Sequence, residues 1–161
     1  MNLQCATLLA ISLAIGACEP GRYSDETIQL CLDDDKGVAY FERALRTVST
    51  RYELELFDDS ERVRRDLDEL DALPDQDRVI HWHSHDKSEG IEITATNLGL
   101  GSYDVIVSYD LRSARQRHAA SDLRGLLEQQ FDVIQLPKEA GASPIKNCPP
   151  DTAIDNKGET T

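Results

Sequence analysis

The stretch IHWHSHDKSEGIEITATNLGLGSYDVIVSY (residues 80–109) decides the fold of this chain. It contains three runs in which apolar and polar residues alternate, at residues 80–84, 91–95 and 103–109. A period of two is typical of strands that bury one face. Only short turn-like segments connect the three runs, so no helix can lie between them. The sequence therefore predicts a three-stranded antiparallel meander.

Two turns set the expected register of this meander. One turn lies at residues 88–89 and the next at residues 99–101, where two glycines flank a leucine. The register must place the apolar side chains of neighbouring strands on the same face. The expected pairs are Trp82 with Ala95, Ser84 with Ile93, and Ile93 with Val107.

Helices are predicted on both sides of the meander. Apolar residues recur at three- and four-residue steps in residues 35–51, 60–71 and 113–130. In the second of these helices, Val63, Leu67 and Leu70 are expected to face inward. Shorter runs at residues 52–56 and 133–136 predict further strands. The predicted fold is a single α+β domain, an antiparallel sheet with about three helices packed on one face.

Three histidines alternate with other residues on the first meander strand. Side chains two apart on a strand share a face, so His81, His83 and His85 should line the side opposite Trp82. Imidazoles at this spacing can share one Zn²⁺ or Cu²⁺ ion, and the register sets Glu92 opposite His85. The candidate metal site is therefore His83, His85 and Glu92. The alternatives are a docking or pH-sensitive surface, and a polar sheet face without a special role.

Acidic residues dominate the chain and concentrate in one segment. The formal net charge is −13, and residues 53–77 hold eleven Asp or Glu against three Arg. Such a field attracts basic proteins and disfavours binding to nucleic acid. The alternative interpretation is an ordinary solvated face. The candidate partner-binding residues are Glu53, Glu55, Asp58, Asp59, Asp66, Asp68 and Glu69.

The N-terminus carries an apolar run, residues 6–17, that ends in Ile15-Gly16-Ala17-Cys18. This motif resembles the lipobox of bacterial lipoprotein signal peptides, although residues 1–4 contain no Lys or Arg. The resemblance implies cleavage before Cys18 and attachment of lipid, including palmitate, to that residue. Because Glu19 rather than Asp follows, it also implies an outer-membrane anchor facing the periplasm. The alternative is an ordinary secretory signal cut after Ala17.

The remaining cysteines fit an exported protein. Cys5 leaves with the signal peptide and Cys18 takes the lipid, so Cys31 and Cys148 remain as one pair. In an oxidising compartment such a pair predicts a disulfide, with two unpaired thiols as the alternative. The expected organisation is a signal peptide (residues 1–17), a lipidated tether (18–26), the α+β domain (27–148) and a flexible tail (149–161).

These observations predict a binding protein and not an enzyme. Ser84 stands between two histidines, but neighbours on a strand point to opposite faces, so neither imidazole can deprotonate it. The leading hypothesis is a lipid-anchored periplasmic inhibitor or immunity protein that blocks a cationic toxin or cell-wall hydrolase. The alternatives are a metal-binding or metal-delivering envelope lipoprotein, and a structural or assembly lipoprotein of the envelope. No cofactor is expected apart from the Zn²⁺ or Cu²⁺ of the metal alternative.

Overall fold

A computed structural model of the chain describes residues 26–70, 78–86, 90–137 and 148, with the side chains of all of these except residues 90–92. No helix within these ranges is both long and apolar enough to cross a bilayer. The proposed signal peptide, most of the tether and the tail lie outside the described residues.

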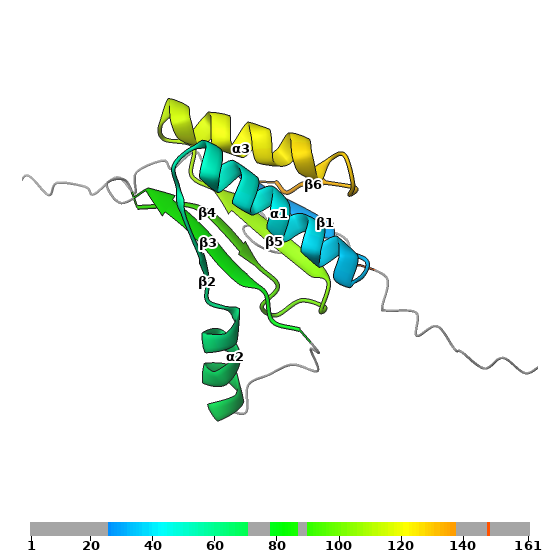
Figure 1. Cartoon of the computed structure of the whole chain (residues 1–161). Coiled ribbons are helices and arrows are strands. Elements are labelled where there is room, and N and C mark those ends of the chain that lie inside the picture. Colours follow the sequence, from blue (N-terminus) through cyan, green and yellow to red (C-terminus); the bar gives the residue numbers. More distant parts are fainter. Residues whose placement is uncertain (1–25, 71–77, 87–89, 138–147, 149–161) are drawn as a thin grey trace, which may run out of the picture.

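The described residues form a six-stranded antiparallel sheet with three helices, which confirms the predicted single α+β domain (Figure 1). The strands lie in the order β2-β3-β4-β5-β1-β6. Helices α1 and α3 lie side by side on one face of the sheet. The elements in chain order are β1 (Glu26–Cys31), α1 (Asp35–Arg51), β2 (Glu55–Asp58), α2 (Ser60–Glu69), β3 (His81–Asp86), β4 (Gly90–Thr96), β5 (Asp104–Tyr109), α3 (Ala114–Leu127) and β6 (Ile134–Gln135).

Strand β1 is an element that the sequence analysis did not identify. It pairs with β5 on one side and with the short strand β6 on the other. It starts at Glu26, the last residue that the sequence analysis assigned to the tether. Ile28 and Leu30 of β1 are buried beneath the helices and make this strand part of the core.

The meander forms as predicted, and the first hairpin has the expected register up to Ser84. Trp82 pairs with Ala95 and Ser84 with Ile93. A bulge then shifts the register, so that His85 lies opposite Ile91 and not opposite Glu92. Between β4 and β5 the register is offset by two residues from the prediction, and Ile93 pairs with Tyr109. An offset of two leaves every side chain on its predicted face, because the side-chain period of a strand is two.

The core lies between the two helices and the inner face of the sheet. Trp82 of β3 stacks on Phe41 of α1, with ring centroids 5.6 Å apart. Both helices begin with a hydrogen-bonded cap. The Gly37 N–H donates to Asp34 Oδ1 at the start of α1, and Ser113 and Gln116 form a reciprocal capping box at the start of α3. These caps fix where each helix starts over the sheet.

Helix α2 does not take the position that its apolar residues predict. It projects away from the sheet instead of lying beside α1 and α3 (Figure 1), and none of its residues is buried. Val63 and Leu67 are half-buried and Leu70, just past its end, is 74% exposed. The three residues share a helical stripe, but the described chain fully buries none of them. The expectation that they face the core was therefore wrong.

Candidate partner-binding surface

The three histidines of β3 lie on the sheet face that α1 and α3 leave uncovered. Phe57 of the neighbouring strand β2 stacks against two of them, with ring centroids 5.1 Å from His83 and 5.0 Å from His85. The two imidazoles are nearly parallel and 6.0 Å apart. We call Phe57, His81, His83 and His85 the aromatic ladder. The sequence analysis missed Phe57, although the alternation that turns Leu56 inward turns Phe57 outward.

A carboxylate from the start of α2 lies at one end of this ladder. Asp59 Oδ2 is 3.6 Å from His83 Nδ1. The His81 backbone holds this corner together, because its N–H donates to Ser60 Oγ and its carbonyl accepts from the Asp59 N–H. Burial lowers the pKa of His81, and neighbouring His83 lowers it further. At neutral pH His81 is therefore an uncharged ring.

The side chain of Glu92, the third residue of the candidate metal site, lies outside the described residues. Within the described ranges, three potential ligand atoms come together only at Cys31, Asp104 and Cys148. Those two sulfurs are bonded to each other and are not available as thiolate ligands. A metal site at His83, His85 and Glu92 stays a prediction.

The predicted disulfide between Cys31 and Cys148 is present. The S–S distance is 1.99 Å, and the two Cα atoms are 5.5 Å apart across a sequence separation of 117 residues. The Cys148 N–H donates to Asp104 Oδ1, which attaches the C-terminal end of the domain to β5. The bridge therefore connects the first strand of the fold to its last described residue.

The acidic residues predicted to bind a partner lie along one edge of the molecule. Strand β2 is an edge strand, and α2 continues from it after a single residue. Of the seven candidates, Asp59 is half-buried and the others are exposed. The seven lie in three groups: Glu53 before β2, Glu55 and Asp58 on β2, and Asp59, Asp66, Asp68 and Glu69 on or beside α2.

Arg62 neutralises part of this charge. Its guanidinium is 3.1 Å from Asp59 and 3.5 Å from Asp66. The hydrogen bond from Arg62 holds the pKa of Asp59 below its usual value. Within the described residues, Asp68 and Glu69 form no ion pair, so the far end of α2 carries uncompensated negative charge.

The acidic helix also carries the uncovered apolar stripe. Val63, Leu67 and Leu70 are spaced four and three residues apart, so they lie on one side of α2. Carboxylates of Asp66, Asp68 and Glu69 lie next to this stripe in the sequence. An apolar strip bordered by charge is typical of a protein-binding surface.

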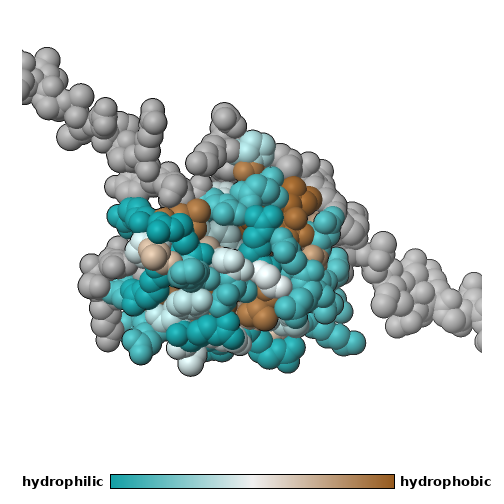
Figure 2. Space-filling view, turned by 90° about the horizontal axis from the view of Figure 1, so that it is seen from above, coloured by the Kyte–Doolittle hydropathy of each residue, from teal (hydrophilic) through white to brown (hydrophobic). Residues whose placement is uncertain are grey.

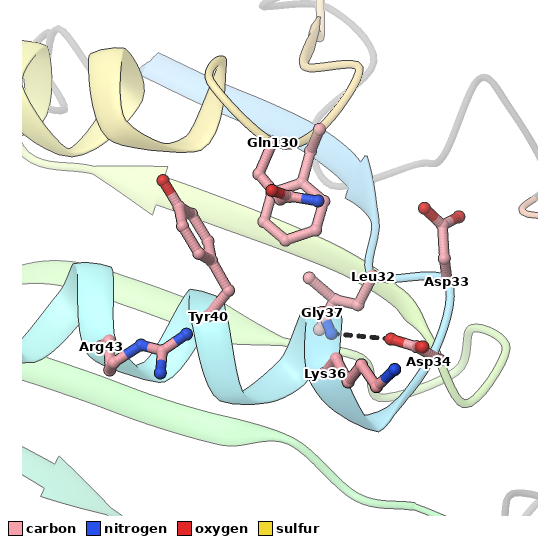
Figure 3. A pocket seen from close by; sticks show the side chains of 9 residues that line it. Leu32, Asp33, Asp34, Lys36, Gly37, Tyr40, Arg43 and Gln130 are labelled. Atoms are coloured by element: carbon pink, nitrogen blue, oxygen red, sulfur yellow. Dashed lines mark hydrogen bonds between the residues drawn. The ribbon is translucent and has the colours of Figure 1, made fainter.

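The opposite side of the molecule offers a different surface. Figure 2 shows the molecule from above, the side on which α3 lies in Figure 1. Hydrophilic residues cover most of this surface, and hydrophobic residues form small separate patches. A pocket of about 350 Å³ opens at the start of α1 (Figure 3). Asp33, Asp34, Lys36 and Arg43 line it with mixed charge, and the Tyr40 hydroxyl is used in a 3.0 Å hydrogen bond to the Leu126 carbonyl. Because acidic and basic side chains both line this pocket, it favours neither an anionic nor a cationic ligand.

Two further observations bear on function. Ser84 is fully buried on the helix-covered face, away from the ladder histidines, and its hydroxyl has no partner within the described residues. Cys18, the predicted lipidation site, lies outside those residues. No protein-family model, curated protein or solved structure matches this chain.

Proposed function

We propose that this protein is a lipid-anchored periplasmic binding protein, an inhibitor or immunity protein that binds a basic partner through the acidic edge formed by β2 and α2. The observation that carries the proposal is α2 itself. It buries no residue in the domain, yet it displays an apolar stripe beside exposed carboxylates. A helix that contributes so little to the core is best explained by a contact outside the chain.

Charge on this edge supports a basic partner. Residues 53–70 hold eight Asp or Glu and three Arg, a net charge of −5, and two of the carboxylates share Arg62. A concentrated field of one sign speeds the encounter with a partner of the opposite sign and orients it. Cationic toxins and cell-wall hydrolases are the partners that a periplasmic anchor would bring within reach.

The apolar stripe would supply binding affinity, to which exposed charges alone contribute little. Exposed ion pairs contribute little net affinity, whereas burying a leucine side chain contributes about 1.5–3 kcal/mol. Leu70 and the exposed part of Leu67 would be buried by a partner that lies along α2. The carboxylates would then set the rate and orientation of binding, and the stripe would set the lifetime of the complex.

The first step of the test identifies the partner. The full-length anchored protein is cross-linked in the envelope of its own cell, and the captured protein is purified. Binding is then measured by calorimetry at salt concentrations from about 0.05 M to about 0.5 M. The proposal expects affinity to fall steeply as salt rises.

Matched charge reversals locate the surface. Asp66→Lys/Asp68→Lys changes the acidic edge, and Glu42→Lys/Glu128→Lys changes the α1–α3 side by the same amount, each moving the net charge from −13 to −9. We expect the first pair to weaken binding about tenfold or more and the second to leave it nearly unchanged. Equal effects of the two pairs, or salt-independent affinity, would refute binding through this edge.

A second candidate function is metal binding at His83, His85 and Glu92, supported by the spacing of the two imidazoles. The parallel imidazoles of His83 and His85 lie 6.0 Å apart, with Asp59 beside His83. If they share a metal ion, Zn²⁺ should raise the Tm at a pH of about 7.5 and have little effect near pH 5, where imidazoles are protonated. His83→Ala and His85→Ala should each abolish the rise, while His118→Ala on α3 should not. A rise that survives in all three variants would mean diffuse binding.

A further inference from the structure

A second hollow, of about 340 Å³, lies between α3 and the ends of β1 and β5. It is on the helix-covered side of the sheet, separate from the β2–α2 edge. Apolar and charged groups both line it: Glu26 from β1, Tyr109 from β5, Leu111 from the connection, and Arg117, Ala120 and Arg124 from α3. Its volume is at the lower end of the range for small-molecule sites.

The Tyr109 hydroxyl at this hollow is a buried donor without an acceptor. Tyr109 is 1% exposed, and its hydroxyl oxygen has no hydrogen-bond partner within the described residues. Burial raises the pKa of this phenol far above its ordinary value, and the Glu26 carboxylate raises it further. The group therefore stays protonated. Tyr109 contributes to the wall of the hollow, but its hydroxyl oxygen is closed off from solvent.

The two arginines of the hollow differ in how their charge is balanced. Arg124 is 2.6 Å from Glu26 and 2.7 Å from Glu128, so carboxylates already neutralise it. Arg117 uses one nitrogen, Nη1, to donate to the carbonyls of Leu111 and Arg112. It forms no ion pair with any carboxylate of the described chain. The hollow therefore has one uncompensated positive charge, in a protein whose net charge is −13.

We propose that this hollow binds a small organic carboxylate with an apolar body. The carboxylate would pair with the Arg117 guanidinium, and the body would pack against Leu111 and Ala120. The uncharged Tyr109 side chain would form the inner wall of the site. An inorganic anion would leave the apolar wall unused, and an organic cation would meet only the unpaired charge of Arg117.

Phenylacetate is a suitable probe, with the uncharged amide phenylacetamide as its matched control. A ligand of about ten non-hydrogen atoms should bind with a Kd on the order of 1 mM. Titration is followed by backbone NMR on the whole mature chain. We expect saturable shifts at α3 residues 117–124 and at Tyr109 with phenylacetate, and much weaker binding of the amide.

Three variants complete the test. Arg117→Gln should weaken phenylacetate binding about tenfold. Tyr109→Phe removes a buried hydroxyl that a ligand in the hollow does not reach, so it should leave binding nearly unchanged and should not lower the Tm. Ser84→Ala also removes a buried, unpaired hydroxyl but lies away from the hollow, and should leave binding unchanged. The proposal is overturned if phenylacetate does not saturate, if the amide binds equally well, or if Arg117→Gln has no effect. None of these outcomes bears on partner binding at β2 and α2.

Discussion

Gly37 occupies the first turn of α1, where the helix lies against the chain that leads into it. A Cβ atom at this position would be 1.6 Å from the Leu32 carbonyl oxygen. That oxygen is held in place, because it accepts from the Asp34 N–H while the Leu32 N–H donates to the Tyr103 carbonyl. The position is therefore restricted by contact, and no side chain fits without moving backbone.

Two glycine substitutions should have opposite effects on stability. Gly37→Ala should lower the free energy of unfolding by about 1–3 kcal/mol or more, because the new methyl group overlaps backbone. Gly125→Ala should raise it by roughly 0.5–1 kcal/mol, since alanine is the better helix former and open space surrounds this position on α3. Urea unfolding measures both. A loss of stability in both variants would contradict this account of Gly37.

The half-buried ring of His81 predicts a pH dependence of stability. Burial lowers its pKa in the folded state, whereas the unfolded residue takes up a proton near its usual pKa of about 6.5. The unfolded state thus binds more protons as the pH falls through this region, so the free energy of unfolding should fall from about pH 7.5 to about pH 5.5. The Asp59 carboxylate opposes this effect, but less strongly.

The measurement is urea unfolding at both pH values. His81→Gln should reduce the difference between them, while His118→Gln, at an exposed position on α3, should retain it. An unchanged difference in the His81→Gln protein would show that other groups cause it.

Among the elements, α2 and α3 differ most in how they use their apolar residues. In α3, Leu123 and Leu127 are fully buried against the sheet. In α2, Val63 and Leu67 are only half-buried and Leu70 is largely exposed. A similar spacing of apolar residues therefore builds the core in one helix and leaves an uncovered stripe in the other.

Matched leucine truncations should separate these roles. Leu123→Ala should lower the free energy of unfolding by about 2–5 kcal/mol, because it leaves a cavity in the core. Leu67→Ala should cost less than about 1 kcal/mol but should weaken binding of the partner. Thermal or urea unfolding gives the first comparison and calorimetry the second. A large loss of stability in Leu67→Ala would argue that α2 is a structural helix.

Local patterns predicted the meander and the flanking helices α1 and α3, but missed strand β1. Alternation placed Trp82 inward and the histidines outward, and the offset of two between β4 and β5 did not disturb this. The bulge after Ser84 depends on contacts that no local pattern encodes. Strand β1 alternates polar Thr27 and Gln29 with apolar Ile28 and Leu30, so its local pattern was present in the sequence but was missed. Its place in the sheet comes from pairing with β5, more than 70 residues away.

The candidate sites show the same limit. The acidic edge could be predicted because its charges are adjacent in sequence. The stacking of Phe57 on His83 depends on pairing between β2 and β3, which α2 separates along the chain. The hollow at Tyr109 joins β1, β5 and α3, so no spacing of residues could have indicated it. The spacing of Val63, Leu67 and Leu70 predicted an apolar stripe on α2. Spacing alone does not tell which surface covers such a stripe.

At the scale of the whole molecule, the strand at which the described chain begins and the acidic edge lie on different parts of the sheet. The described chain enters at β1, next to the edge strand β6, whereas β2 forms the opposite edge. A tether at the N-terminal side of β1 would leave the β2–α2 edge free to meet a partner.

Lipidation can be tested with two cysteine variants. Cys18→Ala should abolish acylation and shift the mature protein from the membrane fraction and the detergent phase to the soluble fraction. Cys5→Ala, within the proposed signal peptide, should leave partitioning unchanged. Fractionation and mass spectrometry of the N-terminal peptide report both results. Membrane association of Cys18→Ala equal to that of the wild type would refute the lipobox interpretation.

The Cys31–Cys148 bridge makes the domain a closed covalent ring. Every described element except the first residues of β1 lies within the ring, because its two ends are 117 residues apart in the chain. A protease that cuts one peptide bond between these cysteines opens the ring but releases no fragment. Both pieces stay joined to β1 and, through it, to whatever holds the N-terminus. Two cuts, or one cut and a reductant, are needed before any part of the fold can diffuse away.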